Sequence, residues 1–438
     1  MTPGSDRDSN NRPGHTPLDV ENYPVAPATL QLEQVHVFVR HGERTPVSIR
    51  MSEAPANIPP TWLLCKEGRK FGAAVSSHTG SNILGVERVV ENEDGSLEPG
   101  ECLLGELTDL GRKSTYNLGA ALRGVYIDKL KLLPDVAHND SEVYFRSTNL
   151  PRTIESLQQI IHGLYPPLKQ AEGFVSKIRT RNPKDENLYG NSAVCERLKT
   201  LMLKFAQAAA VAWNPTLEPL DEKISKYIGG NPVRLDGKPR ASGILDTVRA
   251  ARAHGIRIPE ELRDNTVMDV LEKAVIEEWF SAYRTEEVRK LAMGRLLAEM
   301  SGKMNQTATG TGPTAPKILI HSTHDTAIAG LLGTLEVFDN RWPEFTAVVT
   351  FELFREAPDS RPAGSFLTRL LSSFTTSGVR EKHYIRARYQ NTTLFLPLCQ
   401  NVGDHLDGHP ELCTLEAFNR RVKELTPKWE VECALHQR

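Results

Sequence analysis

Three segments of this chain share one pattern, in which an apolar run that reads as a buried strand ends directly in a polar cluster. The apolar runs lie at about 33–40, 142–147 and 317–321, and the clusters at their ends are Arg40-His41-Gly42-Glu43-Arg44, Arg146-Ser147-Thr148 and His324-Asp325-Thr326. Helical periodicity follows the second and third clusters. Strands that alternate with helices in this way are typical of an α/β core.

Further periodic segments complete the predicted fold. Two later runs, 347–354 and 384–389, have the length and composition of strands. Apolar residues at helical spacing cover 108–126, where Thr108 is a suitable N-cap, and also a segment that ends at Ile161. We therefore expect an α/β fold with a mixed, mostly parallel sheet flanked by helices on both faces.

Composition along the chain indicates how this fold is divided. Residues 1–30 are rich in Pro, Asn, Asp and Ser, which predicts a disordered or draped N-terminal tail. The α/β core is expected at 31–164 and 301–438. The interval 165–300 holds long helical stretches and few strand candidates, so we expect an inserted, mostly helical subdomain there.

Charge and hydropathy exclude several classes of protein. The chain has 438 residues and a formal net charge of -2, so it lacks the broad basic surface of a generic nucleic-acid binder. No apolar run is long enough to cross a bilayer, and no stable membrane insertion is expected. The first residues lack the apolar centre of a signal peptide, which favours a soluble, intracellular protein. A leader already removed is the open alternative.

The six cysteines are too sparse to indicate a fold built on disulfides, and none forms a C-x-x-C pair of the kind that binds zinc. Cys399 and Cys413 flank a loop rich in Gly, Asp and His, and we expect them to form a disulfide if the compartment is oxidising. Glycosylation sequons at Asn139, Asn305 and Asn391 arise often by chance and do not indicate secretion.

The three polar clusters predict a single site. In open α/β sheets, ligands bind beyond the carboxyl ends of the strands, so the clusters converge on one crevice with three arginines, two histidines and an aspartate. Guanidinium groups match a tetrahedral oxyanion because their fixed fork forms paired N–H···O bonds. The N-terminus of the helix that begins after Asp325 adds backbone donors. A phosphoryl group is the ligand that this set predicts.

The same residues indicate a reaction. A neutral imidazole such as His41 is a nucleophile toward phosphorus, and arginines around it neutralise phosphoryl oxygens that would otherwise repel it. Asp325 is placed to protonate a leaving alkoxide and then to deprotonate water. Gly42 is expected to leave room for the substrate beside the backbone.

The motifs resemble those of a known family. R-H-G-E-R-T-P matches the signature R-H-G-x-R-x-P of the histidine acid phosphatases, a branch of the histidine phosphatase superfamily. G-E-L-T-D-L-G, F-R-S-T-N-L-P-R-T and H-S-T-H-D-T are similar to three further motifs of that family and occur in the family order. The resemblance extends over about 33–435 and is weakest within 165–300.

The resemblance implies a function and a set of site residues. It implies hydrolysis of a phosphate monoester, a small molecule, through a covalent phosphohistidine, without a metal or organic cofactor. Family members are often dimers, so a possible homodimer also follows. The implied roles are nucleophile for His41, proton donor for Asp325, and phosphate binding for Arg40, Arg44, Arg146 and His324.

Other interpretations remain open at this point. A phosphotransferase or mutase would use the same fold and pass the phosphoryl group to a hydroxyl, and a degenerate member would bind phosphorylated ligands without catalysis. The substrate is also open among a lysophospholipid, an inositol phosphate, a sugar phosphate and an isoprenoid phosphate. His321 lies close to His324 in sequence, but we interpret it as structural and not as half of a metal pair. Glu43 points either to solvent or to substrate, and Ser114 stands where the family often has glutamine.

Overall fold

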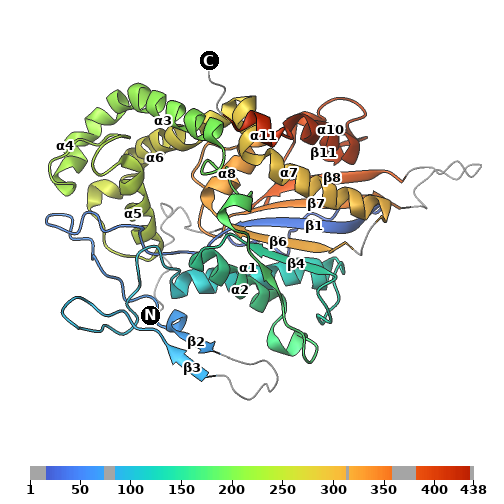
Figure 1. Cartoon of the computed structure of the whole chain (residues 1–438), viewed down its shortest axis with the longest axis horizontal. Helices are drawn as coiled ribbons and strands as arrows, with labels where there is room; N and C mark the ends of the chain where they lie inside the picture. Colours follow the sequence, from blue (N-terminus) through green and yellow to red (C-terminus); the bar gives the residue numbers. More distant parts are fainter. Residues whose placement is uncertain (1–15, 74–83, 312–314, 358–380, 435–438) are drawn as a thin grey trace, which may run out of the picture.

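The first predicted strand, β1 (Leu30–Arg40), joins the two halves of a nine-stranded sheet (Figure 1). The computed structural model describes residues 16–73, 84–311, 315–357 and 381–434. The strand order is β10-β11-β8-β7-β1-β6-β4-β5, and β9 pairs with β8. The bounds of the strands after β1 are β4 (Val143–Ser147), β5 (Ile178–Arg179), β6 (Ile318–Thr323), β7 (Val348–Glu356), β8 (His383–Tyr389), β9 (Thr392–Thr393), β10 (His405–Leu406) and β11 (His409–Thr414).

The sheet is parallel on one side of β1 and antiparallel on the other. β1 pairs parallel with β6, β6 with β4, and β4 with β5. From β7 onward every described pairing is antiparallel. The mixed α/β fold is therefore confirmed, but the expectation of a mostly parallel sheet is wrong. An apolar run indicates that a strand is buried on both faces and does not indicate the direction of its neighbour.

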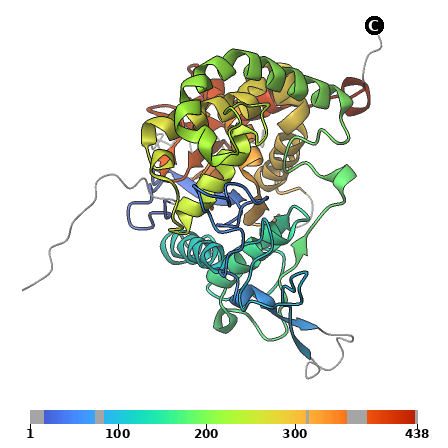
Figure 2. The ribbon, with the colours of Figure 1, turned by 90° about the vertical axis from the view of Figure 1, so that its left-hand side faces the viewer.

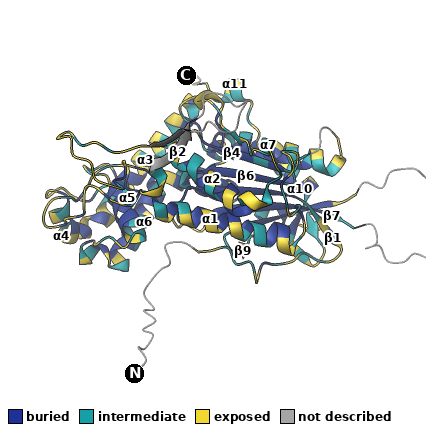
Figure 3. Cartoon of the chain, turned by 90° about the horizontal axis from the view of Figure 1, so that it is seen from below, coloured by how far each residue is buried: buried dark blue, intermediate teal, exposed yellow. Residues whose placement is uncertain are grey.

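Helices cover both faces of the sheet, as expected. α1 (Asp109–Arg123) and α2 (Pro151–Leu164) pack on one face, and Figure 3 shows them lying across the buried strands. α7 (Glu286–Thr309), α8 (Asp325–Thr334) and α10 (Leu415–Leu425) pack on the other face. The side chains of β1 alternate between these two apolar layers, as the period of a strand requires.

The helices that precede α7 lie together (Figure 2), and a third apolar cluster holds them. It joins side chains from the middle of α3 to α6 with others from residues 51–62. The helices are α3 (Glu196–Leu217), α4 (Asp221–Ile224), α5 (Ala241–Ala253) and α6 (Asn265–Phe280). α7 instead crosses the expected boundary at residue 300 and packs on the sheet. Residues 51–105 also contain a separate pair of strands, β2 (Lys70–Ala73) and β3 (Leu84–Glu87).

The expected N-terminal tail is described from residue 16 onward, and this part lies against the sheet. Tyr23 is buried, and its hydroxyl donates to the Glu352 carboxylate at 2.6 Å. Asn391, one of the sequon residues, accepts from the backbone N–H of Asp19 at 2.9 Å and donates to the carbonyl of Pro17 at 2.8 Å. The residues between about 16 and 30 are therefore draped over the core.

All six cysteines are paired. The predicted Cys399–Cys413 disulfide is confirmed, and two others, Cys65–Cys102 and Cys195–Cys433, were not predicted. The second of these links the start of α3 to the residue after α11 (Trp429–Glu432). Disulfides are rare in reducing compartments and persist in oxidising ones. Within the described ranges, no helix has both the length and the apolar character needed to span a bilayer.

The contact between α1 and α2 is so close that it requires glycine. A Cβ atom on Gly119 would lie 2.1 Å from the carbonyl oxygen of Ile160. We expect Gly119→Ala to destabilise the fold by about 1–3 kcal/mol, because the helices must separate to admit the methyl group. The midpoint of thermal unfolding measures the loss.

Gly302 in α7 is the matched control for this substitution. A Cβ atom there would meet nothing within 4 Å, so Gly302→Ala is expected to stabilise the protein by up to about 1 kcal/mol through helix propensity. Equal unfolding midpoints for the two variants would contradict the packing argument.

Candidate active site

The ends of three strands bring the predicted polar clusters together. The register of the parallel pair β1–β6 places Arg40 beside Thr323, and the rings of His41 and His324 lie edge to face with centroids 5.6 Å apart. β4 ends next to them, and the hydroxyl of Thr148 lies 3.0 Å from Nε2 of His324. The three clusters therefore meet at the carboxyl ends of the strands, as expected.

The loop that carries His41 rests on the N-terminus of α1. A Cβ atom on Gly42 would lie 2.4 Å from the carbonyl oxygen of Gly111, and one on Gly111 would lie 2.2 Å from the carbonyl oxygen of Glu43. Thr108 caps the helix by accepting from the N–H of Gly111 at 3.2 Å. The expectation that Gly42 makes room for substrate is therefore wrong, because the backbone of α1 fills that space.

His41 is held as a neutral imidazole with a defined tautomer. Its Nδ1 lies 2.9 Å from the carbonyl oxygen of Gly42, and since a carbonyl only accepts, Nδ1 carries the hydrogen. The lone pair is therefore on Nε2. Burial, followed by the charges of Arg40 and Arg44, lowers the pKa of His41 well below its usual value. The ring consequently stays unprotonated in mildly acidic solution.

Arg40 is fixed on three sides. Its Nη1 donates to the carbonyl oxygen of Pro343 at 2.6 Å, and its Nη2 pairs with Oδ2 of Asp325 at 2.8 Å. The guanidinium lies 4.2 Å above the centre of the Phe345 ring. Burial lowers the pKa of Arg40 to about 10, so the group remains charged at neutral and acidic pH.

Arg44 is held by the helical subdomain. Its Nη2 pairs with Oδ1 of Asp246 in α5 at 2.8 Å, and its Nη1 donates to the carbonyl oxygen of Thr45 at 2.9 Å. The Nε atoms of Arg40 and Arg44 are buried and make no hydrogen bond to the described part of the chain. Buried donors require acceptors, and an oxyanion beside His41 is the acceptor that matches these two.

His324 and Asp325 begin α8. Burial and then the charge of Arg152 lower the pKa of His324 to about 4, so this ring is also neutral. Burial alone would raise the pKa of Asp325, but the charges of Arg40 and Arg44 outweigh it and the net pKa is lowered. The Asp325 carboxylate is therefore ionised in the free protein.

The structure does not bring Arg146 to the His41 cluster. The guanidinium of Arg146 is fully buried, and its Nη2 donates to the Glu186 carboxylate at 2.5 Å and to the Asn187 amide oxygen at 2.7 Å. In the β4–β6 ladder Arg146 pairs with His321, one residue pair before the ladder ends. The phosphate-binding role expected for Arg146 thus lacks geometric support, because carboxylate and amide oxygens bind both of its Nη atoms and leave only its Nε without a partner among the described residues.

Arg152, which the sequence interpretation missed, faces the cluster instead. It follows Pro151 in the first turn of α2, and its charge helps to lower the pKa of both His41 and His324. Its Nε is buried without a hydrogen bond to the described residues. The signal was present in R-S-T-N-L-P-R-T, which contains two arginines. The prediction assigned phosphate binding to the first of them, Arg146, because that residue ends a strand.

Two open questions about neighbouring residues are answered. Glu43 is buried and interacts with Ser114 of α1, and burial raises its pKa, so it does not face solvent. His321 stacks on Phe38 with ring centroids 4.6 Å apart, within the sheet face and away from His41. Across the described ranges, no group of three or more His, Cys, Asp or Glu side chains is arranged to hold a metal ion.

Comparisons with known proteins identify the family of this chain. Residues 31–390 match the model of a family described as histidine phosphatase superfamily (branch 2). A probable acid phosphatase of Schizosaccharomyces pombe is 35% identical over 435 residues, which cover 92% of this chain and 93% of that protein. Lysophosphatidic acid phosphatase type 6 of Mus musculus is 28% identical over 341 residues, covering 76% and 77%. The apo form of Hafnia alvei phytase has the same fold, with a TM-score of 0.57 and 16% identity, and covers 94% of this chain and 100% of its own.

The different roles of Arg146 and Arg152 in phosphate binding are testable. We expect Arg152→Ala to weaken the binding of inorganic phosphate by about 10–100-fold, because a charge-assisted hydrogen bond contributes about 1.5–3 kcal/mol. Isothermal titration with phosphate measures the loss.

Arg146→Ala is the comparison variant and should behave differently. It leaves the Glu186 carboxylate buried without its cation, so the cost is about 3–5 kcal/mol of stability, while the folded fraction binds phosphate normally. The assignment is wrong if Arg146→Ala weakens phosphate binding and Arg152→Ala does not.

Proposed function

The chain belongs to branch 2 of the histidine phosphatase superfamily, and from this premise we propose that it hydrolyses a phosphate monoester with His41 as nucleophile and Asp325 as proton donor. It is a phosphomonoesterase of the acid phosphatase type, in agreement with the family match and the names of its relatives. The observation that carries the proposed roles is the neutral His41 ring, with its lone pair on Nε2, beside buried arginine donors.

In the first step, Nε2 of His41 attacks phosphorus, and the P–O bond to the leaving group breaks as the N–P bond forms. Arg40, Arg44 and Arg152 neutralise the phosphoryl oxygens and stabilise charge in the transition state. Asp325 transfers its proton to the leaving alkoxide. A bound phosphate dianion competes for the charge of Arg40, and this raises the pKa of Asp325 relative to the free protein, so that the carboxyl group is protonated when needed.

In the second step, water attacks the phosphohistidine. The Asp325 carboxylate accepts a proton from that water, the N–P bond breaks, and phosphate leaves with His41 restored as a neutral imidazole. The low pKa of His41 supports turnover in acidic solution, since the ring is not protonated there.

The alternatives have less support. A phosphotransferase or mutase would need an acceptor hydroxyl in place of water, and the relatives that match along most of the chain are named phosphatases. A non-catalytic binder would have lost at least one reacting group, whereas both His41 and Asp325 are present. With glycerol added as acceptor, the ratio of free phosphate released to phosphorylated glycerol formed distinguishes hydrolysis from transfer.

The proposed nucleophile has a direct test. We expect His41→Ala to abolish hydrolysis of phenyl phosphate and to abolish acid-labile, base-stable labelling of the protein by radioactive substrate. Asp325→Asn should slow the same hydrolysis by about 10²–10⁴-fold, the usual contribution of general acid catalysis. His138→Ala, at an exposed histidine, is the control and should retain full activity. Labelling that persists in His41→Ala would refute the assignment.

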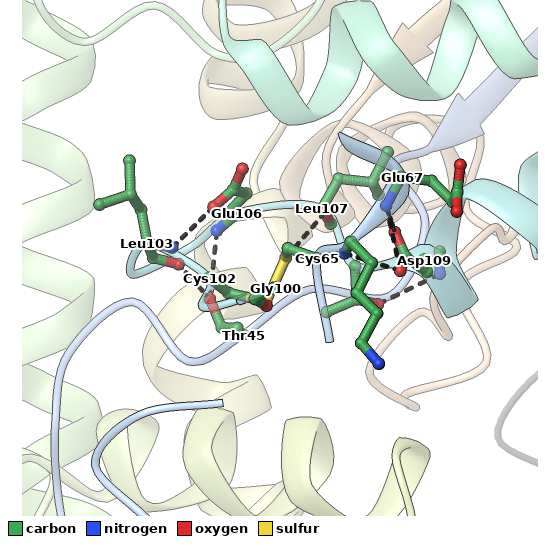
Figure 4. Close-up of a disulfide and its surroundings, with 12 residues drawn as sticks. Thr45, Cys65, Glu67, Gly100, Cys102, Leu103, Glu106, Leu107 and Asp109 are labelled. Carbon is green, nitrogen blue, oxygen red and sulfur yellow. Dashed lines mark hydrogen bonds between the residues drawn. A yellow bond between two sulfur atoms is a disulfide. The ribbon is translucent and has the colours of Figure 1, made fainter. Parts of the chain in front are cut away.

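A set of exposed apolar side chains lies near the proposed site, and we infer that these side chains contact the leaving group. The strand-like segment after Arg44 pairs with residues 103–107, since the N–H of Thr45 donates to the carbonyl of Glu106 at 3.1 Å. The Cys65–Cys102 disulfide and the bond from Leu103 N–H to the Glu106 carboxylate hold that second segment (Figure 4). The exposed apolar side chains on these segments are Val47, Ile49, Leu103 and Leu104, and exposed Leu150 precedes Arg152 by two residues.

This apolar rim, defined by those five side chains, lies beside the phosphate-binding arginines. A Cβ atom on Gly105 would lie 3.6 Å from Cγ1 of Val47 and 3.9 Å from Nη1 of Arg152. Nearby Arg50 shares the Asp246 carboxylate with Arg44, and Arg88 pairs with Glu106, so the positive charge of this region is partly neutralised. We therefore propose that the preferred substrate is the phosphate monoester of a single-chain amphiphile, acted on in an oxidising compartment.

Substrate chain length tests this proposal. We expect kcat/KM to rise at least about tenfold from butyl phosphate to dodecyl phosphate, because each buried methylene contributes up to about 0.8 kcal/mol. Leu103→Ser combined with Leu104→Ser should flatten that rise and leave phenyl phosphate unaffected. Leu168→Ser, at a leucine outside the rim that is 95% exposed, is the control. A preference for inositol hexakisphosphate over every alkyl phosphate would overturn the proposal.

A further inference from the structure

The carboxylate of Asp325 is held by two side-chain donors and one backbone donor. Oδ2 accepts from Nη2 of Arg40 at 2.8 Å and from the indole Nε1 of Trp342 at 3.1 Å. Oδ1 accepts from the backbone N–H of Thr326 at 2.8 Å. Arg40 is required to bind the phosphoryl group, so Trp342 is the side-chain donor to this carboxylate that has no other part in the proposed reaction.

The position of Trp342 is itself set by the helical subdomain. Its backbone N–H donates to Oε1 of Glu272 in α6 at 2.9 Å, and its carbonyl accepts from Nη2 of Arg249 in α5 at 3.2 Å. Arg249 and Glu272 pair with each other at 2.9 Å, and Arg249 also pairs with Glu344 at 3.0 Å. Two helices therefore hold both backbone groups of this residue.

Aromatic packing restrains the indole ring. The Trp342 ring lies 5.2 Å from Phe280 and 5.8 Å from Trp279, measured between centroids. With its backbone held by an ion pair and its ring held by two aromatic neighbours, the indole N–H points to Oδ2 of Asp325. An indole is only a donor, so it favours the carboxylate and fixes which way that group faces.

From this geometry we propose that Trp342 is a positioning residue, through which α5 and α6 orient the Asp325 carboxyl group toward the leaving oxygen. The inference rests on the proposed function, since it assigns the proton donor to Asp325. Proton transfer requires the acid to lie within hydrogen-bond reach of the leaving oxygen. A carboxyl group that rotates freely meets this condition for only part of the time.

Other groups around Asp325 affect its protonation as well. They are cationic or titratable and come from β1, the loop after it, α2 and α8: Arg40, Arg44, Arg152 and His324. All of them also face the phosphoryl site, so replacing any one changes substrate binding and acid catalysis together. Trp342 is the neighbour whose replacement separates the two effects.

Trp342→Phe keeps the ring and removes the N–H. With an alkyl phosphate, whose leaving group needs a proton, we expect kcat to fall about tenfold, a fraction of the 10²–10⁴-fold that a general acid contributes. With 2,4-dinitrophenyl phosphate, whose leaving group departs without a proton, kcat should fall less than about twofold. KM should change little for either substrate. The basic limb of the kcat profile should move to higher pH, because a carboxylate that loses a donor has a higher pKa.

Trp279→Phe is the matched control, because it alters the same aromatic cluster without a bond to Asp325, and it should show none of these changes. Glu272→Ala leaves the indole intact but releases its backbone, and should show the same dependence on the leaving group to a smaller extent. It also keeps the inference testable if Trp342→Phe folds poorly.

The outcomes distinguish a failure of the role proposed for Trp342 from a failure of the proposed function. Equal losses with both substrates, or no loss with either, would show that Trp342 has only a structural role, even if His41→Ala is inactive. Activity in His41→Ala would instead refute the proposed function itself.

Discussion

The buried ion pair between Arg40 and Asp325 connects the fold of this protein to its chemistry. It joins the last residue of β1 to the first residue of α8, and the parallel pairing of β1 with β6 makes it possible. Removing one partner of a buried pair typically costs about 3–5 kcal/mol, so the end of the sheet is constrained as a unit. His41, the proposed nucleophile, follows Arg40 directly and is positioned by the same constraint.

This arrangement explains why the site contains so many cations around a neutral ring. Burial and positive charge both lower the pKa of His41, and the same positive charge lowers the pKa of Asp325. The free site therefore favours the binding of a dianion. The imidazole is unprotonated, and the arginine Nε donors make no hydrogen bond within the described part of the chain. A bound phosphoryl group shifts this balance and favours a protonated Asp325.

The helical subdomain contributes to the site through charge and not only through shape. Asp246 holds Arg44, while Glu272 and Arg249 hold the backbone of Trp342. The proposed reacting groups lie at the end of the sheet. The groups that orient them come from helices with a separate apolar cluster. Variation in those helices would alter the leaving-group side of the site while leaving the sheet intact.

Local sequence patterns were sufficient for the elements of the fold and for part of the site. The periodicity around 33–40 and 317–321 predicted β1 and β6, and the clusters at their ends placed His41 beside His324. These predictions succeed because strand period, helix spacing and capping are properties of neighbouring residues. The direction of the strands after β6 was not readable in this way, because burial does not encode direction.

The remaining features depended on which surfaces meet in three dimensions. Arg146 and Arg152 belong to one short motif, yet strand alternation directs the first toward Glu186 and the first turn of α2 directs the second toward His41. Gly42 is required by α1 and not by a ligand. The Cys65–Cys102 and Cys195–Cys433 pairs join residues that are distant in sequence. The sequence by itself thus determined the elements, the candidate nucleophile and the reaction class, whereas tertiary packing decided which arginine faces His41, because that depends on how α2 docks on the sheet.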